Sequence, residues 1–124
     1  MIAFGTAIMA RDMTAMAGLL HPDATFTSPA VFRPYQGRAA VLRVLTAAAQ
    51  TIEDFAYTGE AHGPGTDVLR FRGRVGTYQL EGVDIVTTGE DGLITDVTVM
   101  VRPLRGLEAL VGGMRQALAR LPDS

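Results

Sequence analysis

Hydrophobic and polar residues alternate along the segment from Leu80 to Arg102, which predicts two β-strands. The residues between the strands, Gly89 to Gly92, favour a tight turn because glycine and aspartate tolerate the positive φ angles of hairpin loops. On the first strand, Asp84 shares a face with Leu80 and Val86, which are apolar. A carboxylate on such a face is costly unless it is hydrogen-bonded, paired or protonated, so Asp84 is the first candidate for a functional residue.

Three other segments have the composition or alternation of strands: residues 24–28, 52–61 and 68–75. In the last of these, Arg70, Arg72 and Arg74 share one face, whereas Leu69 and Phe71 take the other. An arginine-rich face can bind phosphate. A solvated or dimer-facing sheet surface, opposite acidic side chains, is the commoner arrangement, and we adopt that interpretation.

Helical periodicity indicates three further regions: residues 2–20, 38–50 and 104–121. We expect the first region to be broken near Arg11, because Asp12 has the character of a new N-cap. The Gly112-Gly113 pair weakens the last helix, so a kink or a close backbone contact is expected there. Pro29 follows the first strand and restricts that strand to a sheet edge or a bulge.

Composition narrows the possible functions. The 124 residues suffice for one domain with a core, and a net charge of −2 provides no electrostatic footprint for nucleic acid. The absence of cysteine excludes disulfides and thiolate metal sites, and His21 and His62 lack the spacing of metal ligands. No apolar run reaches the length of a membrane span. We therefore expect a cytoplasmic protein that has no cofactor and that binds neither nucleic acid nor membrane.

The order of the elements predicts an α+β fold with a mainly antiparallel sheet, since the helices are separated from a contiguous run of strands. Such a sheet must curl around the N-terminal helices to bury one face, which leaves a cone with an apolar interior. The interior face is expected to carry Leu69, Phe71, Leu80, Asp84, Val86, Val97, Val99 and Val101. Asp84 would then be desolvated, with a raised pKa and no basic side chain on the strand faces around it.

The segments LLHPDATFTSP, YQGRAAVLRVL and LEGVDIVTTGEDGLITDVTV resemble the nuclear-transport-factor-2-like superfamily, especially its SnoaL-like and ketosteroid-isomerase-like members. The resemblance extends over nearly the whole chain to about Arg102 and implies a single SnoaL-like domain over residues 1–124, with a cystatin-like cone. The matching residues are Leu20, Asp23, Ala24, Thr25, Pro29, Gly37, Arg38, Ala40, Val41, Asp84, Asp91, Gly92 and Ile94. Because this fold carries unrelated functions, the resemblance indicates the fold more strongly than the activity.

In ketosteroid isomerases, an aspartate base acts with a tyrosine and a protonated aspartate that form an oxyanion hole. By resemblance, Asp84 takes the position of the oxyanion-hole aspartate, Ser28 takes that of the base, and Phe4 takes that of the tyrosine. One of three functional groups is retained, which argues against steroid isomerisation. The acidic residue that related cyclases place on the last strand is also missing here, because that strand presents valines.

Two functions remain open. The first is a cyclase or isomerase that acts on an apolar carbonyl or ring compound, with Asp84 as its catalytic acid; the second is a non-catalytic module for apolar-ligand binding or dimerisation. For Asp84 itself, the alternative to catalysis is a carboxylate that organises the interior through hydrogen bonds. By resemblance, we also expect a homodimer packed through the outer sheet face. The expected ligand pocket comprises Phe26, Ser28, Phe32, Tyr35, Phe55, Tyr57, Leu69, Phe71, Leu80, Val86, Val97, Val99 and Val101.

Overall fold

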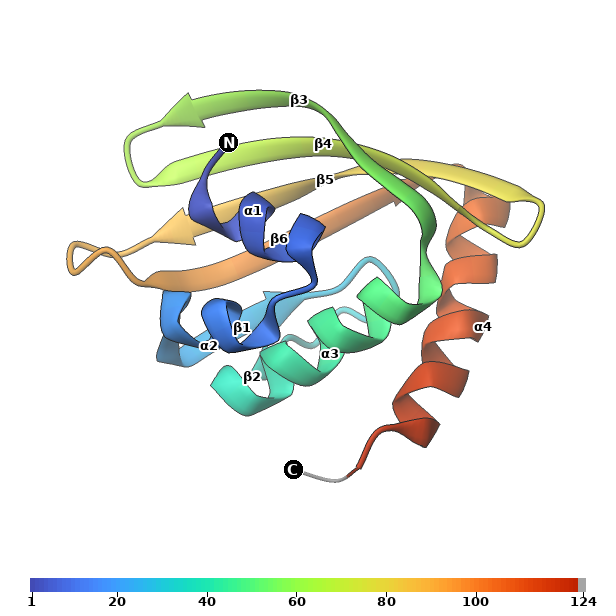
Figure 1. The fold of residues 1–124 in the computed structure, drawn as a ribbon, viewed down its shortest axis with the longest axis horizontal. Coiled ribbons are helices and arrows are strands. Elements are labelled where there is room, and N and C mark those ends of the chain that lie inside the picture. The colour runs from blue at the N-terminus through green and yellow to red at the C-terminus, as the bar shows by residue number, and fades with distance from the viewer. Residues whose placement is uncertain (123–124) are drawn as a thin grey trace.

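A computed structural model describes residues 1–122 as a strongly curved sheet with helices on its concave side (Figure 1). The elements are α1 (Ala3–Ala10), α2 (Met13–Leu19), β1 (Leu20–Thr27), β2 (Tyr35–Gln36), α3 (Arg38–Thr51), β3 (Glu53–Gly63), β4 (Thr66–Val75), β5 (Tyr78–Thr88), β6 (Ile94–Arg102) and α4 (Leu104–Arg120). The strand order is β2-β1-β6-β5-β4-β3, and β1 and β6 form the parallel pair in an otherwise antiparallel sheet. The predicted α+β cone is therefore confirmed.

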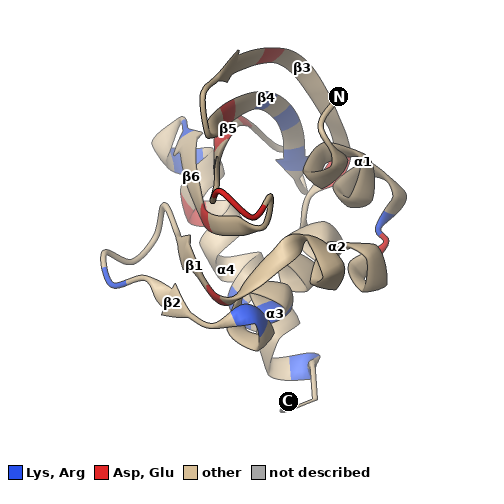
Figure 2. Cartoon of the chain, turned by 90° about the vertical axis from the view of Figure 1, so that its left-hand side faces the viewer, with Lys and Arg blue, Asp and Glu red and all other residues tan. Residues whose placement is uncertain are grey.

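The sheet curls so strongly that β3 to β6 arch over the space that the early helices close (Figure 2). The break between the first two helices lies where the sequence predicted it. Arg11 ends α1 in the left-handed conformation, and the Asp12 side chain accepts a hydrogen bond from the backbone N–H of Ala15 at 2.9 Å. This N-cap satisfies one donor at the start of α2. The chain consequently turns between α1 and α2 instead of continuing as one rod.

The register of the central strands confirms the predicted inner face. Asp84 pairs with Leu69 on β4 and with Val99 on β6, so these three side chains point to the same side of the sheet. Gly82 on the same face must lack a side chain, because a Cβ atom there would lie 2.1 Å from the carbonyl oxygen of Met100. The arginines Arg70 and Arg72 point to the opposite side and are exposed.

Of the two alternatives predicted for the first strand, a sheet edge or a bulge, the structure shows an irregularity of the bulge type. β1 is not an edge strand, because the two-residue strand β2 pairs with it on the side away from β6. Its pairing with β6 is irregular between Leu20 and Thr25, and Pro22, which has no N–H to donate, falls within that interval. Further along the chain, β3 continues through His62 and Gly63, two residues beyond the end of the predicted strand at residue 61.

The terminal helix α4 shows the close contact expected at its glycine pair. A Cβ atom on Gly113 would lie 2.5 Å from Cγ2 of Thr51, at the end of α3. The guanidinium of Arg43 on α3 also donates to the Leu118 carbonyl at 2.7 Å. These contacts hold α4 against α3 at one end of the cone.

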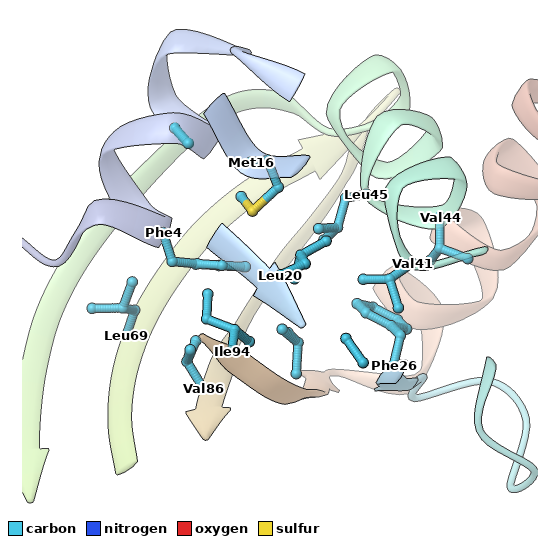
Figure 3. Close-up of a cluster of buried hydrophobic side chains, with 13 residues drawn as sticks. Phe4, Met16, Leu20, Phe26, Val41, Val44, Leu45, Leu69, Val86 and Ile94 are labelled. Carbon is cyan, nitrogen blue, oxygen red and sulfur yellow. The ribbon is translucent and has the colours of Figure 1, made fainter. Parts of the chain in front are cut away.

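The largest hydrophobic core lies where α1, α2 and α3 meet the sheet (Figure 3). Its side chains come from all of these elements and point toward one another. The labelled members are Phe4, Met16, Leu20, Phe26, Val41, Val44, Leu45, Leu69, Val86 and Ile94. A smaller cluster of Ile52, Phe71, Leu80 and Leu110 joins the sheet to α4. Between residues 1 and 122, no helix combines the length and the apolar character that crossing a membrane requires.

Candidate functional site

A cavity of about 520 Å³ lies inside the cone, within the size range of small-molecule sites. Its walls come from the inner sheet face, from α1, α3 and α4, and from the loop that follows β1. Most of its lining side chains are aliphatic or aromatic. The polar and charged side chains that line it belong to Arg11, Ser28, Tyr35, Asp54, Asp84 and Arg115.

Asp84 lines this cavity from β5 and is 7% exposed. Its Oδ2 atom accepts a hydrogen bond of 2.8 Å from the hydroxyl of Tyr57 on β3. Its Oδ1 atom has no hydrogen-bond partner among residues 1–122. In the same residues, every polar side-chain atom that is fully enclosed by protein does have a hydrogen-bond partner. Oδ1 is therefore not enclosed by protein, and it is the oxygen that a molecule in the cavity can reach.

The surroundings of Asp84 alter its protonation. Burial raises the pKa of Asp84 to about 7, and the hydrogen bond from Tyr57 opposes this rise. Burial and the neighbouring Asp84 charge both raise the pKa of Tyr57, so the tyrosine stays protonated and acts as the donor in this pair. A carboxyl group with a pKa near neutrality can either donate or accept a proton at pH 7.

The structure brings together eight of the residues that the sequence placed at the site. These residues line the cavity: Phe26, Ser28, Tyr35, Phe55, Phe71, Asp84, Val99 and Val101. Tyr57 does not line the cavity, but its hydroxyl donates a hydrogen bond to Asp84, which does.

The other predicted pocket residues lie elsewhere, and their assignment to the pocket is corrected. Leu69, Leu80, Val86 and Val97 do face inward, but helices and neighbouring strands cover them completely, and they belong to the closed cores. Phe32 is fully exposed, at 101%, in the loop between β1 and β2. Alternation identifies the face of a strand, but it does not indicate which part of that face a helix will cover.

Sequence reasoning did not assign the helical wall of the cavity. That wall contains Ile8, Met9, Arg11, Val44, Leu45, Ala48, Ala49, Leu107, Leu110, Val111, Met114, Arg115 and Leu118. The signal for the apolar members was the helical periodicity already used to predict the helices, which does not separate core positions from cavity positions. The two arginines gave no signal, because they are isolated charges on helical segments.

The two positions that correspond to other catalytic groups do not supply them. Ser28 lines the cavity, but its Oγ accepts hydrogen bonds from the backbone N–H groups of Ala30, at 2.9 Å, and Val31, at 3.4 Å. This side chain therefore shapes the loop. Phe4 is buried in the wall and carries no polar group. Asp84 is consequently the buried titratable side chain of this cavity within the described part of the chain.

The two histidines lie outside the cavity. Both ring nitrogens of His62 face carboxylates, with Nδ1 at 2.6 Å from Asp67 and Nε2 at 3.1 Å from Glu60, and the bond to Asp67 raises the pKa of His62. His21 Nδ1 accepts a hydrogen bond from the backbone of Asp23 at 2.9 Å. No group of three or more histidine, aspartate and glutamate side chains within residues 1–122 is arranged to hold a metal ion.

Comparison with proteins of known structure places this geometry in context. The chain is 40% identical to a steroid delta-isomerase from Pseudomonas aeruginosa, with a TM-score of 0.90, over 94% of this chain and 86% of that one. It is 28% identical to an uncharacterized cystatin-like protein from Silicibacter pomeroyi, with a TM-score of 0.90, over 95% and 84% of the two chains. A protein with a ketosteroid isomerase-like fold from Catenulispora acidiphila shares 16% identity, with a TM-score of 0.65 and 89% of each chain covered.

The last of these similarities supports the fold alone. No protein with curated annotation matches the chain. The family described as the SnoaL-like domain matches residues 2–97, which is more than half of the chain. Together with the cone and the isomerase-like neighbours, this match shows that the chain belongs to the SnoaL-like domain family of the nuclear-transport-factor-2-like superfamily.

Proposed function

We propose that this protein binds an apolar small molecule that carries a carbonyl group, and that Asp84 donates a hydrogen bond to the carbonyl oxygen. One observation carries the proposal: Asp84 lies in an apolar cavity with Tyr57 on one carboxyl oxygen and with the other oxygen open to the cavity. Desolvation raises the pKa of this group to about 7, so the protonated, donating form is present at neutral pH.

The same donor would make the protein an isomerase or cyclase. A hydrogen bond to a carbonyl oxygen stabilises the negative charge that develops there when a proton leaves the neighbouring carbon, and it is strongest in a water-poor site. The 40% identical protein from Pseudomonas aeruginosa is a steroid delta-isomerase, which supports a ring ketone as the substrate class. Because Ser28 accepts backbone hydrogen bonds and cannot replace a carboxylate base, and because Asp84 keeps its proton while it donates, we assign the proton acceptor to water.

A non-catalytic binding protein is the second candidate. It is favoured by the lack of a second buried titratable side chain on the cavity wall in the described part of the chain. Proton transfer at carbon usually requires an acid and a base placed on the same substrate. A cavity with one such group is sufficient to orient a ligand.

The test uses 2-tetralone, a bicyclic ketone with exchangeable protons next to its carbonyl group. Calorimetry measures its binding, and proton NMR in heavy water measures the exchange of those protons. We expect binding by the native protein, retention within about threefold in Asp84→Asn, and a loss of about tenfold in Asp84→Ala, as one hydrogen bond to a carbonyl is worth about 1.4 kcal/mol. Absence of binding by the native protein would overturn the proposal.

The exchange rate separates the two candidates. Faster exchange that persists in Asp84→Asn and disappears in Asp84→Ala identifies Asp84 as a hydrogen-bond donor. Exchange that is lost equally in both variants identifies it as the base, and binding without faster exchange identifies a non-catalytic protein. Asp96→Asn is the matched control, because Asp96 lies on neighbouring β6, bonds the hydroxyls of Thr25 and Thr98, and does not line the cavity.

We also propose that two copies of the chain pair through the outer sheet face. This face carries an uncharged strip that includes Met100, which is 57% exposed, beside the ion-paired arginines of β4 and β6. Exposed apolar surface of this kind favours burial against a partner. Sedimentation at tens of micromolar should show a dimer that Met100→Arg dissociates; a monomer in the native protein would remove this proposal.

A further inference from the structure

Two exposed arginines line the cavity, and neither has a partner within residues 1–122. Arg11 lies at the junction of α1 and α2, and Arg115 lies on α4. Among the described residues, neither guanidinium has an ion-pair or hydrogen-bond partner, whereas Arg43 and Arg74 are both engaged. An arginine presents five N–H donors, so these two side chains offer unused hydrogen-bonding capacity to whatever occupies the cavity.

The negative charges on the cavity wall do not offset these two cations. Asp54 also lines the cavity, but its carboxylate is bound by Arg74, with Nε at 2.7 Å from Oδ2. Asp84 is partly protonated at neutral pH because burial raises its pKa. The wall therefore carries an excess of positive charge, although the whole chain has a net charge of −2. Both arginine side chains are exposed, so they line the cavity from its solvent side, where an excess of one sign attracts ligands of the opposite sign.

The backbone gives an independent reason to examine Arg11. Its φ angle is 54°, and in residues 1–122 it and Asp54 are the two non-glycine residues with positive φ. Both line the cavity. Glycine or asparagine is the usual residue in this conformation, and an L-residue with a long side chain costs roughly 1 kcal/mol there. Arginine at this position is thus a residue that the backbone disfavours.

We propose that the ligand is an amphipathic carboxylate, with an apolar body and a carbonyl group at Asp84, whose carboxylate pairs with the cavity arginines Arg11 and Arg115. This proposal rests on the proposed function and names the ligand class more closely. A guanidinium matches a carboxylate geometrically, because its planar fork can donate two parallel hydrogen bonds to the two oxygens. A neutral ketone would leave both arginines without a partner in the cavity.

The test compares two ligands that differ only in this charge: 4-(2-naphthyl)-4-oxobutanoate and its primary amide. Both carry the same apolar body and the same ketone. We expect the carboxylate to bind the native protein at least tenfold more tightly than the amide in 50 mM NaCl, and the difference to shrink in 500 mM NaCl because salt screens the pairing. Equal affinities, or tighter binding of the amide, would overturn this inference.

The Arg11→Gln/Arg115→Gln double variant should abolish the preference for the carboxylate, so that the two ligands bind this variant with affinities within about twofold of each other. The control is Arg72→Gln/Arg105→Gln, which removes the same charge from two exposed arginines that do not line the cavity. An equal loss of preference in the control would attribute the effect to net charge and contradict the proposal. If neither ligand binds, the proposed function itself fails; if both bind equally, only the carboxylate preference fails.

Discussion

The two faces of β5 carry carboxylates only three residues apart, but the two groups have different physical roles. On the outer face, Glu81 lies between Arg70 and Arg102, and all three side chains are at least 38% exposed. On the inner face, Asp84 is 7% exposed and has Tyr57 as its hydrogen-bond donor. Water screens the outer group, whereas burial raises the pKa of the inner group to about 7.

This difference shows that residue type alone does not identify the functional carboxylate. Glu81 has more ionic partners than Asp84, yet exposed ion pairs contribute little because solvent already stabilises the separated charges. Asp84 has no ionic partner among the described residues, and for that reason its protonation responds to the cavity and to any ligand in it. The following predictions test this contrast between the faces.

The largest effect is expected from placing a second carboxylate on the inner face. Val86→Asp introduces the charge at a position that is 1% exposed and that lacks a hydrogen-bond donor such as the one Tyr57 provides to Asp84. The change should therefore destabilise the protein by about 3 to 5 kcal/mol or prevent folding. Val83→Asp makes the same change on the outer face, opposite Arg70, and should cost less than about 1 kcal/mol. Urea unfolding of monomeric samples measures both; equal losses would refute the contrast.

The second prediction concerns pH. The pKa of Asp84 is about 7 in the folded chain and about 4 in the unfolded chain, so the folded state retains the proton more strongly between these values. Its contribution to stability is therefore complete below about pH 4 and decreases as the pH rises to about 7, by roughly 2 to 4 kcal/mol. The difference in unfolding free energy between native protein and Asp84→Asn isolates this contribution. A difference that does not change between pH 4 and pH 7 would contradict the raised pKa.

The third prediction tests how closely the inner face is packed. Gly82→Ala places a Cβ atom 2.1 Å from the Met100 carbonyl oxygen, so the strands must separate, and we expect a loss of about 2 kcal/mol. Gly59→Ala is the matched control on β3, because its Cβ atom would meet Arg70 Cβ at an ordinary 3.9 Å. Thermal unfolding should show a clear decrease for the first variant only. A similar decrease in both would attribute the loss to strand glycines in general.

The smallest effect is expected from Glu81→Gln on the outer face. It removes the ion pairs with Arg70 and Arg102, and it should change the unfolding free energy by less than about 1 kcal/mol, with the change vanishing in 500 mM NaCl. Urea titrations at two salt concentrations provide the measurement. A salt-independent loss of several kcal/mol would mean that the outer carboxylate is not screened as proposed.

The sequence alone determined the strand faces and the break between the first two helices. Period-2 alternation placed Asp84 and Val99 on one face, because successive side chains of a strand point to opposite faces. The register confirms this placement, since Asp84 and Val99 are paired across β5 and β6. The capping character of Asp12 located the start of α2 because a local hydrogen bond forms it. Such features depend on neighbouring residues, so they can be read directly from the chain.

The tertiary structure decided which inward residues meet the cavity and which are sealed. Leu69 and Val99 lie on the same sheet face, but helices cover the first, while the second lines the cavity. It also brought Tyr57 to Asp84 from 27 residues away and placed Arg11 and Arg115, which come from different helical segments, around the same cavity. The physical reason is that coverage, desolvation and charge balance depend on how the sheet curls and where α1 and α4 pack, and no local pattern encodes those long-range contacts.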